Sequence, residues 1–264
     1  MIGYVVLDLD GVVYRGGEAC PGAREGLSEL RRMGLRLGFF TNNSTRHRAS
    51  VAELLNGLGI EAQVDEVCTS GRLAGLYLAQ RFPEARVFVI GEFGLVEELR
   101  EAGVQLAAEA SEADTVVVGM DRAINYTKLR EAHVAVVRGA RFIATNRDPC
   151  YPVEGGLTWP GAGSLVAALE TSTGVKPIEL GKPSPLGLQT MAEQWRCRPE
   201  EMLAVGDRLD TDVRSARAFG CTSVIVLTGV TSRSEAENAT PEERRPDYII
   251  GTLAELPGLI RSLR

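Results

Sequence analysis

Histidine and lysine are scarce in this sequence, and its cysteines follow no metal-binding or redox pattern. Two histidines, His47 and His133, are too few for a histidine-based zinc centre and make a Ser-His hydrolase a poor expectation. The five cysteines are scattered and include no Cys-x-x-Cys pair, so we expect reduced thiols rather than a zinc site or a disulfide framework. Only three residues are lysines, which draws attention to Lys182.

Long apolar runs and clusters of basic residues are lacking as well. No apolar stretch approaches the roughly 18 residues of a membrane span, and the N-terminus lacks the basic region of a signal peptide. The net charge of −6 argues against a nucleic-acid-binding surface. We therefore expect a cytoplasmic globular protein that binds neither membranes nor nucleic acids.

Short apolar strands alternate with helices along the whole chain. Strands are expected at 4–8, 35–40, 64–69, 87–90, 115–119, 142–145, 202–205, 223–227 and 248–250, with helices between most of them and a long loop over 146–163. This alternation predicts an α/β fold with parallel sheets and right-handed crossovers.

The first strand delivers two carboxylates, Asp8 and Asp10, into a turn marked by Gly11. Because successive side chains of a strand alternate in direction, the two acids start on one side of the chain. Ligands of open α/β sheets bind just beyond the carboxyl ends of the strands, where these acids lie. Alone, the pair is weak evidence, because acid pairs at strand ends are more often solvated turn residues.

Three further signals lie at the ends of other elements. Thr41 and Asn42 open a helix, which suits phosphate binding or simple N-capping. Lys182 stands in a Gly-Lys-Pro turn, where a solvated lysine is the ordinary alternative. Asp207 and Asp212 follow another apolar strand, where an ordinary turn with a capping acid is the alternative.

Taken together, these residues predict a site for phosphoryl chemistry. If parallel strands gather the four acids, each like-charge pair at about 4 Å costs on the order of 4 kcal/mol at an effective dielectric constant of about 20. A cation would relieve this repulsion, and oxygen-only ligands with open positions favour Mg²⁺. Lys182 adds the positive charge that a phosphoryl group requires.

Four segments resemble the motifs of the haloacid-dehalogenase-like (HAD) superfamily, in its NagD/p-nitrophenylphosphatase-type form (subfamily IIA). They are Asp8–Tyr14, Thr41–Ser44, Gly181–Pro183 and Gly206–Asp212, and the similarity spans essentially the whole chain. The resemblance implies a Mg²⁺-dependent phosphomonoester hydrolase that forms an aspartyl-phosphate. Its substrates would be small phosphorylated metabolites such as a sugar phosphate, phosphoglycolate, a nucleotide or p-nitrophenyl phosphate.

The resemblance also implies a role for each acid. Asp8 would be the nucleophile, and Asp10 the general acid that later activates water. Mg²⁺ would be held by an Asp8 carboxylate oxygen, the Asp10 carbonyl and Asp207, while Asp212 would act largely through a coordinated water. Asp210 would be a neighbour rather than a ligand.

Phosphate binding is implied for four more residues. Thr41 and the backbone of Asn42 would hold the phosphoryl oxygens, with Asn43 assisting. Lys182 would link the nucleophile to the phosphate.

By the same resemblance the chain consists of a Rossmann-like core, 1–80 and 179–264, and an inserted α/β cap of the C2 type, 81–178. The cap would cover the site and select the substrate. Asn146 and Asp148, in the 146–163 loop, are the candidate selecting residues, and a homo-oligomer formed through the cap is compatible with this interpretation.

Three other functions compete with a phosphatase. A receiver-like phospho-acceptor domain without turnover also combines acids, Thr and Lys with Mg²⁺, but it needs neither the Asp10 acid nor an inserted second α/β series. A dinucleotide-binding module has only Gly161-x-Gly163 in its favour, after a proline loop rather than a strand. A dehalogenase would need no acid at position 10 and no Mg²⁺.

Overall fold

The computed structural model describes residues 1–152 and 157–263. These residues form two compact units. The first comprises Met1–Thr41, Ala49–Cys68 and Lys182–Arg264, and the second comprises Asn42–Arg48 and Thr69–Gly181. Within the described ranges, no helix is both long enough and apolar enough to cross a membrane.

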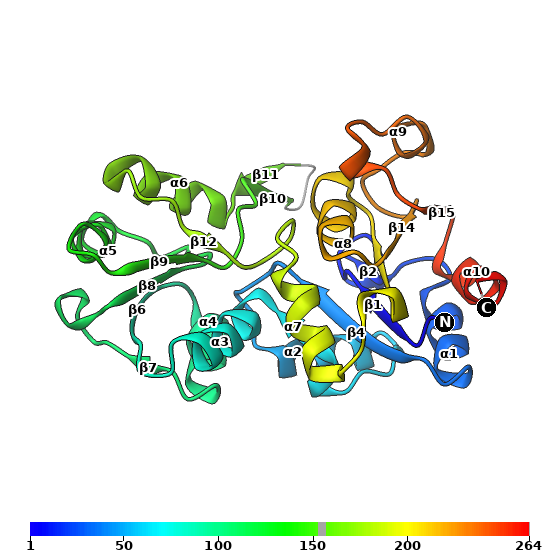
Figure 1. Cartoon of the computed structure of the whole chain (residues 1–264), viewed down its shortest axis with the longest axis horizontal. Helices are drawn as coiled ribbons and strands as arrows, with labels where there is room; N and C mark the ends of the chain where they lie inside the picture. Colours follow the sequence, from blue (N-terminus) through cyan, green and yellow to red (C-terminus); the bar gives the residue numbers. More distant parts are fainter. Residues whose placement is uncertain (153–156, 264) are drawn as a thin grey trace. The chain divides into compact units, whose positions relative to one another are not determined.

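The first unit is built on a parallel sheet in the order β15-β14-β13-β1-β4-β5 (Figure 1). Its strands are β1 (Tyr4–Leu7), β4 (Arg36–Thr41), β5 (Val67–Thr69), β13 (Met202–Gly206), β14 (Thr222–Val226) and β15 (Tyr248–Ile250). Its helices are α1 (Ala23–Arg32), α2 (Arg48–Gly57), α7 (Leu186–Trp195), α8 (Arg214–Phe219), α9 (Arg233–Glu237) and α10 (Leu256–Ser262). A short antiparallel pair, β2 (Tyr14–Arg15) and β3 (Glu18–Ala19), follows β1.

The central strand β1 is buried on both faces, as its unbroken apolar run predicts. Val5 and Leu7 pack into a core that includes Leu27 of α1 and Leu55 of α2. Val6 points to the opposite face of the sheet, because neighbouring side chains of a strand alternate. The polar residues that follow β1 are therefore held on a rigid, fully packed element.

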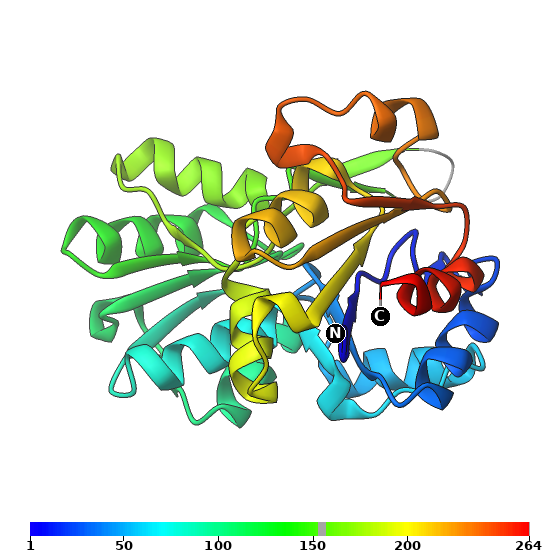
Figure 2. The same ribbon diagram turned by 45° about the vertical axis from the view of Figure 1, so that its right-hand side comes forward.

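The second unit has its own parallel sheet, in the order β12-β9-β8-β6-β7. Its strands are β6 (Arg86–Ile90), β7 (Gln105–Leu106), β8 (Thr115–Val118), β9 (Arg141–Ala144) and β12 (Ile178–Glu179). Helices α3 (Ser70–Arg81) and α4 (Phe93–Glu101) lie on one face, and α5 (Tyr126–Val137) and α6 (Ala162–Thr173) on the other (Figures 1 and 2). Apolar residues of β8 and β9 pack against α5 and α6 to form its core.

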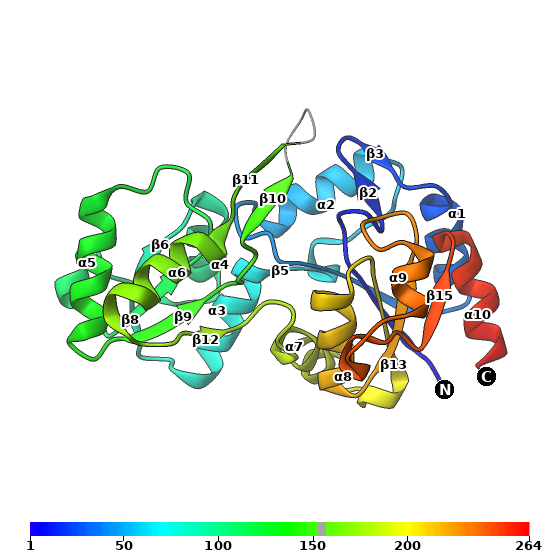
Figure 3. The ribbon, with the colours of Figure 1, turned by 90° about the horizontal axis from the view of Figure 1, so that it is seen from above.

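An antiparallel pair of strands extends from the second unit after β9. It consists of β10 (Cys150–Pro152) and β11 (Thr158–Pro160), where the sequence predicts only a loop over 146–163 (Figure 3). Residues 153–156 of that loop lie outside the described residues. The strands are short and end in prolines, which cannot donate a ladder hydrogen bond, so their composition resembles that of a loop.

The α/β fold with parallel sheets is confirmed, and besides the 146–163 loop two further segments differ from what the sequence predicts. The strand expected at 64–69 is limited to β5, because Val64–Glu66 forms a 3₁₀ turn. The polar segment 231–245 contains α9, which Ser232 caps by accepting a hydrogen bond from the Glu235 backbone. Helix α3 packs with the second unit although all of it except Arg81 lies within the predicted core range 1–80. The division into a core and a cap at 81–178 stays a prediction.

Candidate functional site

The ends of β1, β4 and β13 bring polar residues to one edge of the first unit's sheet. Leu7 lies opposite both Phe39 and Val205 in the parallel register. Asp8, the residue that follows β1, donates its backbone N–H to Val205 O at 2.9 Å. Asp8, Thr41 and Asp207 therefore emerge at the same edge, where ligands of parallel sheets bind.

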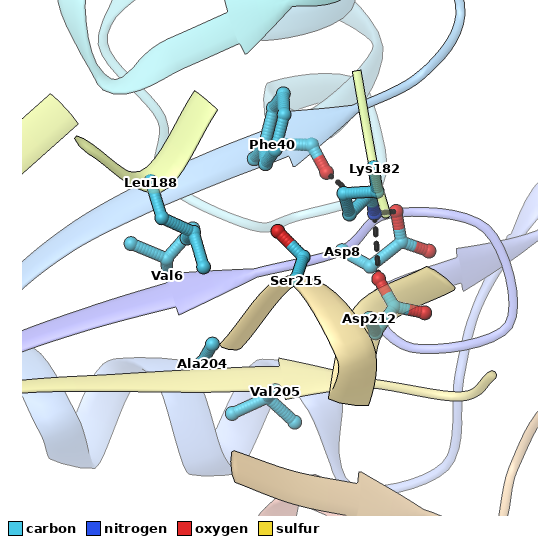
Figure 4. Close-up of a pocket in the computed structure, with 9 residues that line it drawn as sticks. All are labelled: Val6, Asp8, Phe40, Lys182, Leu188, Ala204, Val205, Asp212 and Ser215. Atoms are coloured by element: carbon cyan, nitrogen blue, oxygen red, sulfur yellow. Dashed lines mark hydrogen bonds and ion pairs between the residues drawn. The ribbon is translucent and has the colours of Figure 1, made fainter. Parts of the chain in front are cut away.

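Lys182 lies between two carboxylates in a small pocket at this edge (Figure 4). Its ammonium group donates hydrogen bonds to Asp8 Oδ1, to Asp212 Oδ1 at 2.7 Å and to the carbonyl of Phe40 at 3.3 Å. The lysine is buried with only 6% of its surface exposed. Burial opposes its charge, but the carboxylates of Asp212 and Asp8 hold the pKa of Lys182 above its usual value, so it is a permanent cation.

Burial acts in the opposite sense on Asp8. It raises the pKa of this carboxyl well above its usual value, and the positive charge of Lys182 only partly offsets the effect. Asp212 and Asp207 add repulsion in the same direction as burial. The charged form of Asp8 therefore needs more positive charge than Lys182 provides.

Asp207 follows the last residue of β13 and lies at the same edge of the sheet. Its Oδ2 accepts a hydrogen bond from the Val230 backbone at 2.9 Å, and its side chain is buried. Gly11, with φ +82°, passes so close that a Cβ there would lie 2.5 Å from this oxygen, which explains the glycine after the acid pair. Burial, followed by repulsion from Asp212, raises the pKa of Asp207 to about 6.

A single π-helical turn, Leu209–Val213, separates the roles of the two acids that follow Asp207. Asp212 turns toward Lys182, while Asp210 pairs with Arg208 at 3.0 and 3.1 Å. Although burial would raise the pKa of Asp210, its hydrogen bonds with Arg208 lower it. π turns are frequent at functional sites because they re-aim side chains within a helix.

The carboxylates of Asp8, Asp207 and Asp212 offer ligand atoms that all lie within 4.8 Å of one another. Three acids share the buried cation Lys182 there, and burial penalises the charged forms of Asp8 and Asp207. Such an oxygen-only set fits a hard divalent cation such as Mg²⁺. The residues present therefore fit the metal that the sequence predicts.

Asp10 and Thr41 differ in their exposure at this edge. Asp10 is exposed in the turn after β1, where it forms a bridge with Tyr14. That exposure suits a group that exchanges protons with a substrate and with water. Thr41, the last residue of β4, is buried.

Asn42 and Asn43 belong to the second unit. Asn42 Nδ2 donates to Asp148 Oδ2 at 3.1 Å. The Asn43 side chain accepts hydrogen bonds from the backbone N–H and the hydroxyl of Thr45, both at 2.8 Å. The side chain of Asn43 thus caps the turn that follows it.

Two side chains converge on the carbonyl of Asn42. Asn146 Nδ2 donates to it at 2.7 Å and Ser70 Oγ at 2.5 Å. Asn146 Oδ1 also accepts from the Asp148 backbone at 3.0 Å. Ser70 is a residue that the sequence did not single out, since a serine at a helix start ordinarily signals only capping.

Gly161 and Gly163 are explained by packing in the second unit. A Cβ at Gly161 would lie 2.3 Å from the carbonyl oxygen of Asp148, and one at Gly163 would lie 2.3 Å from that of Arg147. The start of α6 therefore rests directly on the 147–148 backbone. This contact accounts for the two glycines without a dinucleotide.

Comparison with known proteins points to one family. The family model for haloacid dehalogenase-like hydrolases matches residues 5–105, and a second HAD-hydrolase-like model matches 179–256. The sugar-phosphatase AraL of Bacillus subtilis is 36% identical over 256 residues, which cover 97% of this chain and 92% of that protein.

Solved structures agree with the sequence matches. A p-nitrophenyl phosphatase from Archaeoglobus fulgidus superposes with a TM-score of 0.92 at 35% identity and covers 98% of this chain and 99% of its own. A glycerol phosphate phosphatase from Mycobacterium tuberculosis, in complex with magnesium, has a TM-score of 0.89 at 39% identity, over 97% of this chain and 76% of its own. The chain belongs to the haloacid dehalogenase-like hydrolases, among the phosphatases of the p-nitrophenylphosphatase type.

Proposed function

We propose that the protein hydrolyses small phosphomonoesters through a covalent intermediate on Asp8. The observation that carries the proposal is the grouping of the partly buried Asp8 with the buried Lys182, Asp207 and Asp212 at one sheet edge. An Asp8 oxygen attacks phosphorus, and the bond from phosphorus to the ester oxygen breaks as Asp10 protonates the departing alcohol. Asp10 then removes a proton from water, whose oxygen attacks phosphorus and releases inorganic phosphate and free Asp8.

Positioning of the phosphoryl group would rest on four residues. Lys182 offsets the negative charge beside Asp8, where its ammonium group is already fixed. Thr41 supplies a hydroxyl at the end of β4. Asn42 and Asn43 follow it directly in the chain, and backbone N–H groups at such a turn suit phosphate oxygens.

The cofactor in this proposal is Mg²⁺, which Asp8, the Asp10 carbonyl and Asp207 would hold, with Asp212 contributing largely through a coordinated water. When bound, Mg²⁺ neutralises carboxylate and phosphoryl charge. The raised pKa of Asp207 supports this assignment, because a buried acid with unmet charge is a good partner for a cation.

We assign substrate choice to the second unit, because the family resemblance implies that an inserted cap selects the substrate. Asp148 is half-buried rather than buried, and the neighbouring β10–β11 pair exposes Trp159 to 51%. A half-exposed aromatic ring can stack on an organic group, and a half-buried carboxylate can accept hydrogen bonds from one. The substrates proposed are sugar phosphates, phosphoglycolate, nucleotides and p-nitrophenyl phosphate.

The test is an assay of the purified protein on a panel of these esters with Mg²⁺, with EDTA, and with Mg²⁺ restored. We expect hydrolysis only with the metal, and none by Asp8→Asn on any ester. A wild-type protein that accumulates phosphate on Asp8 without releasing it would instead indicate a receiver-like phospho-acceptor. Full activity in EDTA would refute the metal assignment.

A further inference from the structure

The carbonyl of Asn42 is held by two buried donors that lie far away in the sequence. Asn146 donates from 104 residues downstream, and Ser70 from 28. Asn146 is 4% exposed and Ser70 is 0% exposed, so water does not compete for these hydrogen bonds. A carbonyl oxygen has two lone pairs, and two donors satisfy both of them.

This carbonyl fixes the orientation of the next backbone donor. The cis peptide bonds of the described residues are at Lys182-Pro183 and Thr240-Pro241, so the Asn42–Asn43 bond is trans. In a planar trans peptide the carbonyl and the following N–H point in opposite directions. Holding the oxygen of Asn42 toward Ser70 and Asn146 therefore holds the N–H of Asn43 away from them.

The side chains of the same segment have other partners. Asn43 Oδ1 accepts from Thr45, and Asn42 Nδ2 donates to Asp148. Backbone N–H groups at such a turn also suit phosphate oxygens. The direction of the Asn43 N–H depends on the peptide plane that the two buried donors fix.

We propose that Asn146 and Ser70 are positioning residues that orient this peptide for phosphate binding. The proposal rests on the proposed function, and it changes the expectation for Asn146 from selecting the substrate to orienting the donors that every substrate uses. A positioned donor helps catalysis because it needs no reorganisation when charge develops. Every phosphoester shares the phosphoryl group, so loss of either residue should affect all substrates by one factor.

The test is Asn146→Asp, which keeps the shape of the side chain but can place an acceptor where the amide donates. An oxygen facing the Asn42 carbonyl repels it and favours rotation of the peptide plane. We expect kcat/KM to fall about tenfold, which is the upper end of the net contribution of one hydrogen bond. The fall should be equal for every ester. The inhibition constant of inorganic phosphate should rise by the same factor.

A matched control is Asn56→Asp in α2. Asn56 also donates its amide to two backbone carbonyls, those of Ala52 and Ala62, each at 2.8 Å. This change should lower the melting temperature and leave both kinetic constants unaltered. Ser70→Ala removes only one donor and should give a smaller uniform loss; it carries the test if Asn146→Asp does not fold.

Each outcome has a separate meaning. Loss of melting temperature in Asn146→Asp with unchanged kcat/KM and phosphate inhibition would overturn the positioning role. So would a reordered substrate panel with unchanged phosphate inhibition, because it would make Asn146 a substrate contact. A wild-type protein that hydrolyses no ester would refute the proposed function itself, independently of either variant.

Discussion

The ammonium group of Lys182 donates hydrogen bonds to both Asp8 and Asp212, two carboxylates that are more than 200 residues apart in the sequence. The lysine therefore neutralises part of the charge of the proposed nucleophile and fixes its orientation. Removing one partner of a buried ion pair leaves the other charge desolvated, which is far more costly than losing a surface pair.

The first prediction concerns Lys182→Met. We expect it to lower the free energy of unfolding at neutral pH by about 3–5 kcal/mol, because the change leaves buried carboxylates without the cation that pairs with them. Urea unfolding in EDTA measures this directly. Lys176→Met is the control, since Lys176 is exposed and its loss should change stability by no more than about 0.5 kcal/mol. Equal, small effects would mean that Lys182 does not balance the acids.

The second prediction links pH, metal and stability through Asp207. Its folded-state pKa of about 6 lies above the ordinary value of 3.8, so the folded state holds this proton more tightly than the unfolded state. The stabilisation is present at low pH and is lost as pH rises from about 4 through 6, by roughly 2–3 kcal/mol.

Urea unfolding in EDTA between pH 4.5 and 7.5 tests this sign. The metal-free wild type should lose stability with rising pH more steeply than Asp207→Asn, which has no proton to lose there. Added Mg²⁺ should stabilise the wild type more at pH 7.5 than at pH 5. Parallel pH profiles for the two proteins in EDTA would contradict the assignment.

The third prediction distinguishes Asp207 from Asp210 as a metal ligand. Asp210 is paired with Arg208. A carboxylate oxygen of Asp207 instead lies within 4.8 Å of carboxylate oxygens of Asp8 and Asp212. Asp207→Asn should raise the half-saturating Mg²⁺ concentration by at least about 10–100-fold, the loss seen even for outer partners of metal ligands. Asp210→Asn should change it by about twofold, as for a surface residue. Mg²⁺ titration of p-nitrophenyl phosphate hydrolysis gives both values, and equal shifts would show that the wrong ligand was chosen.

The fourth prediction concerns the exposed aromatic residue of the β10–β11 pair. Trp159 packs edge-to-face on Tyr151, with ring centroids 6.2 Å apart. Trp159→Ala should change the ranking of phosphoesters more than it slows p-nitrophenyl phosphate, because stacking acts on the organic group. Phe93→Ala removes a ring that is 72% exposed on α4 and serves as the control. A panel that keeps its order in both variants would remove Trp159 from substrate selection. Asp148→Ala applies the same assay to the half-buried carboxylate of Asp148.

The strand pattern predicts most of the first unit's site. An apolar run that ends at Asp8, and another that ends at Gly206, place their acids at one edge once the strands are parallel. Pairings over long distances in the sequence could not be predicted. The Lys182–Asp212 contact depends on a π turn, and the Asn146–Asn42 contact joins residues 104 positions apart. Hydrophobic periodicity carries no information on such side-chain hydrogen bonds.

The last prediction separates the two acids that follow β1. Asp10→Asn keeps the nucleophile Asp8 and removes the proton donor and base. p-Nitrophenolate departs readily without a proton, so phosphorylation of Asp8 should survive with that ester. Hydrolysis of the intermediate still needs a base, and general acid–base help is typically worth about 10²–10⁴-fold. Turnover should therefore fall by roughly that factor after an initial burst.

An alkyl phosphate provides the internal comparison, because its leaving group needs the proton that Asp10 supplies. With such an ester, Asp10→Asn should show neither a burst nor turnover. Acid-quenched intact-mass measurement detects the phospho-adduct directly, and Asp8→Asn is the control that cannot form it. Because Asp10 is exposed in its turn, the substitution should leave the fold intact. An aryl ester that leaves no adduct on Asp10→Asn, or an adduct that persists in Asp8→Asn, would refute the roles proposed for these two carboxylates.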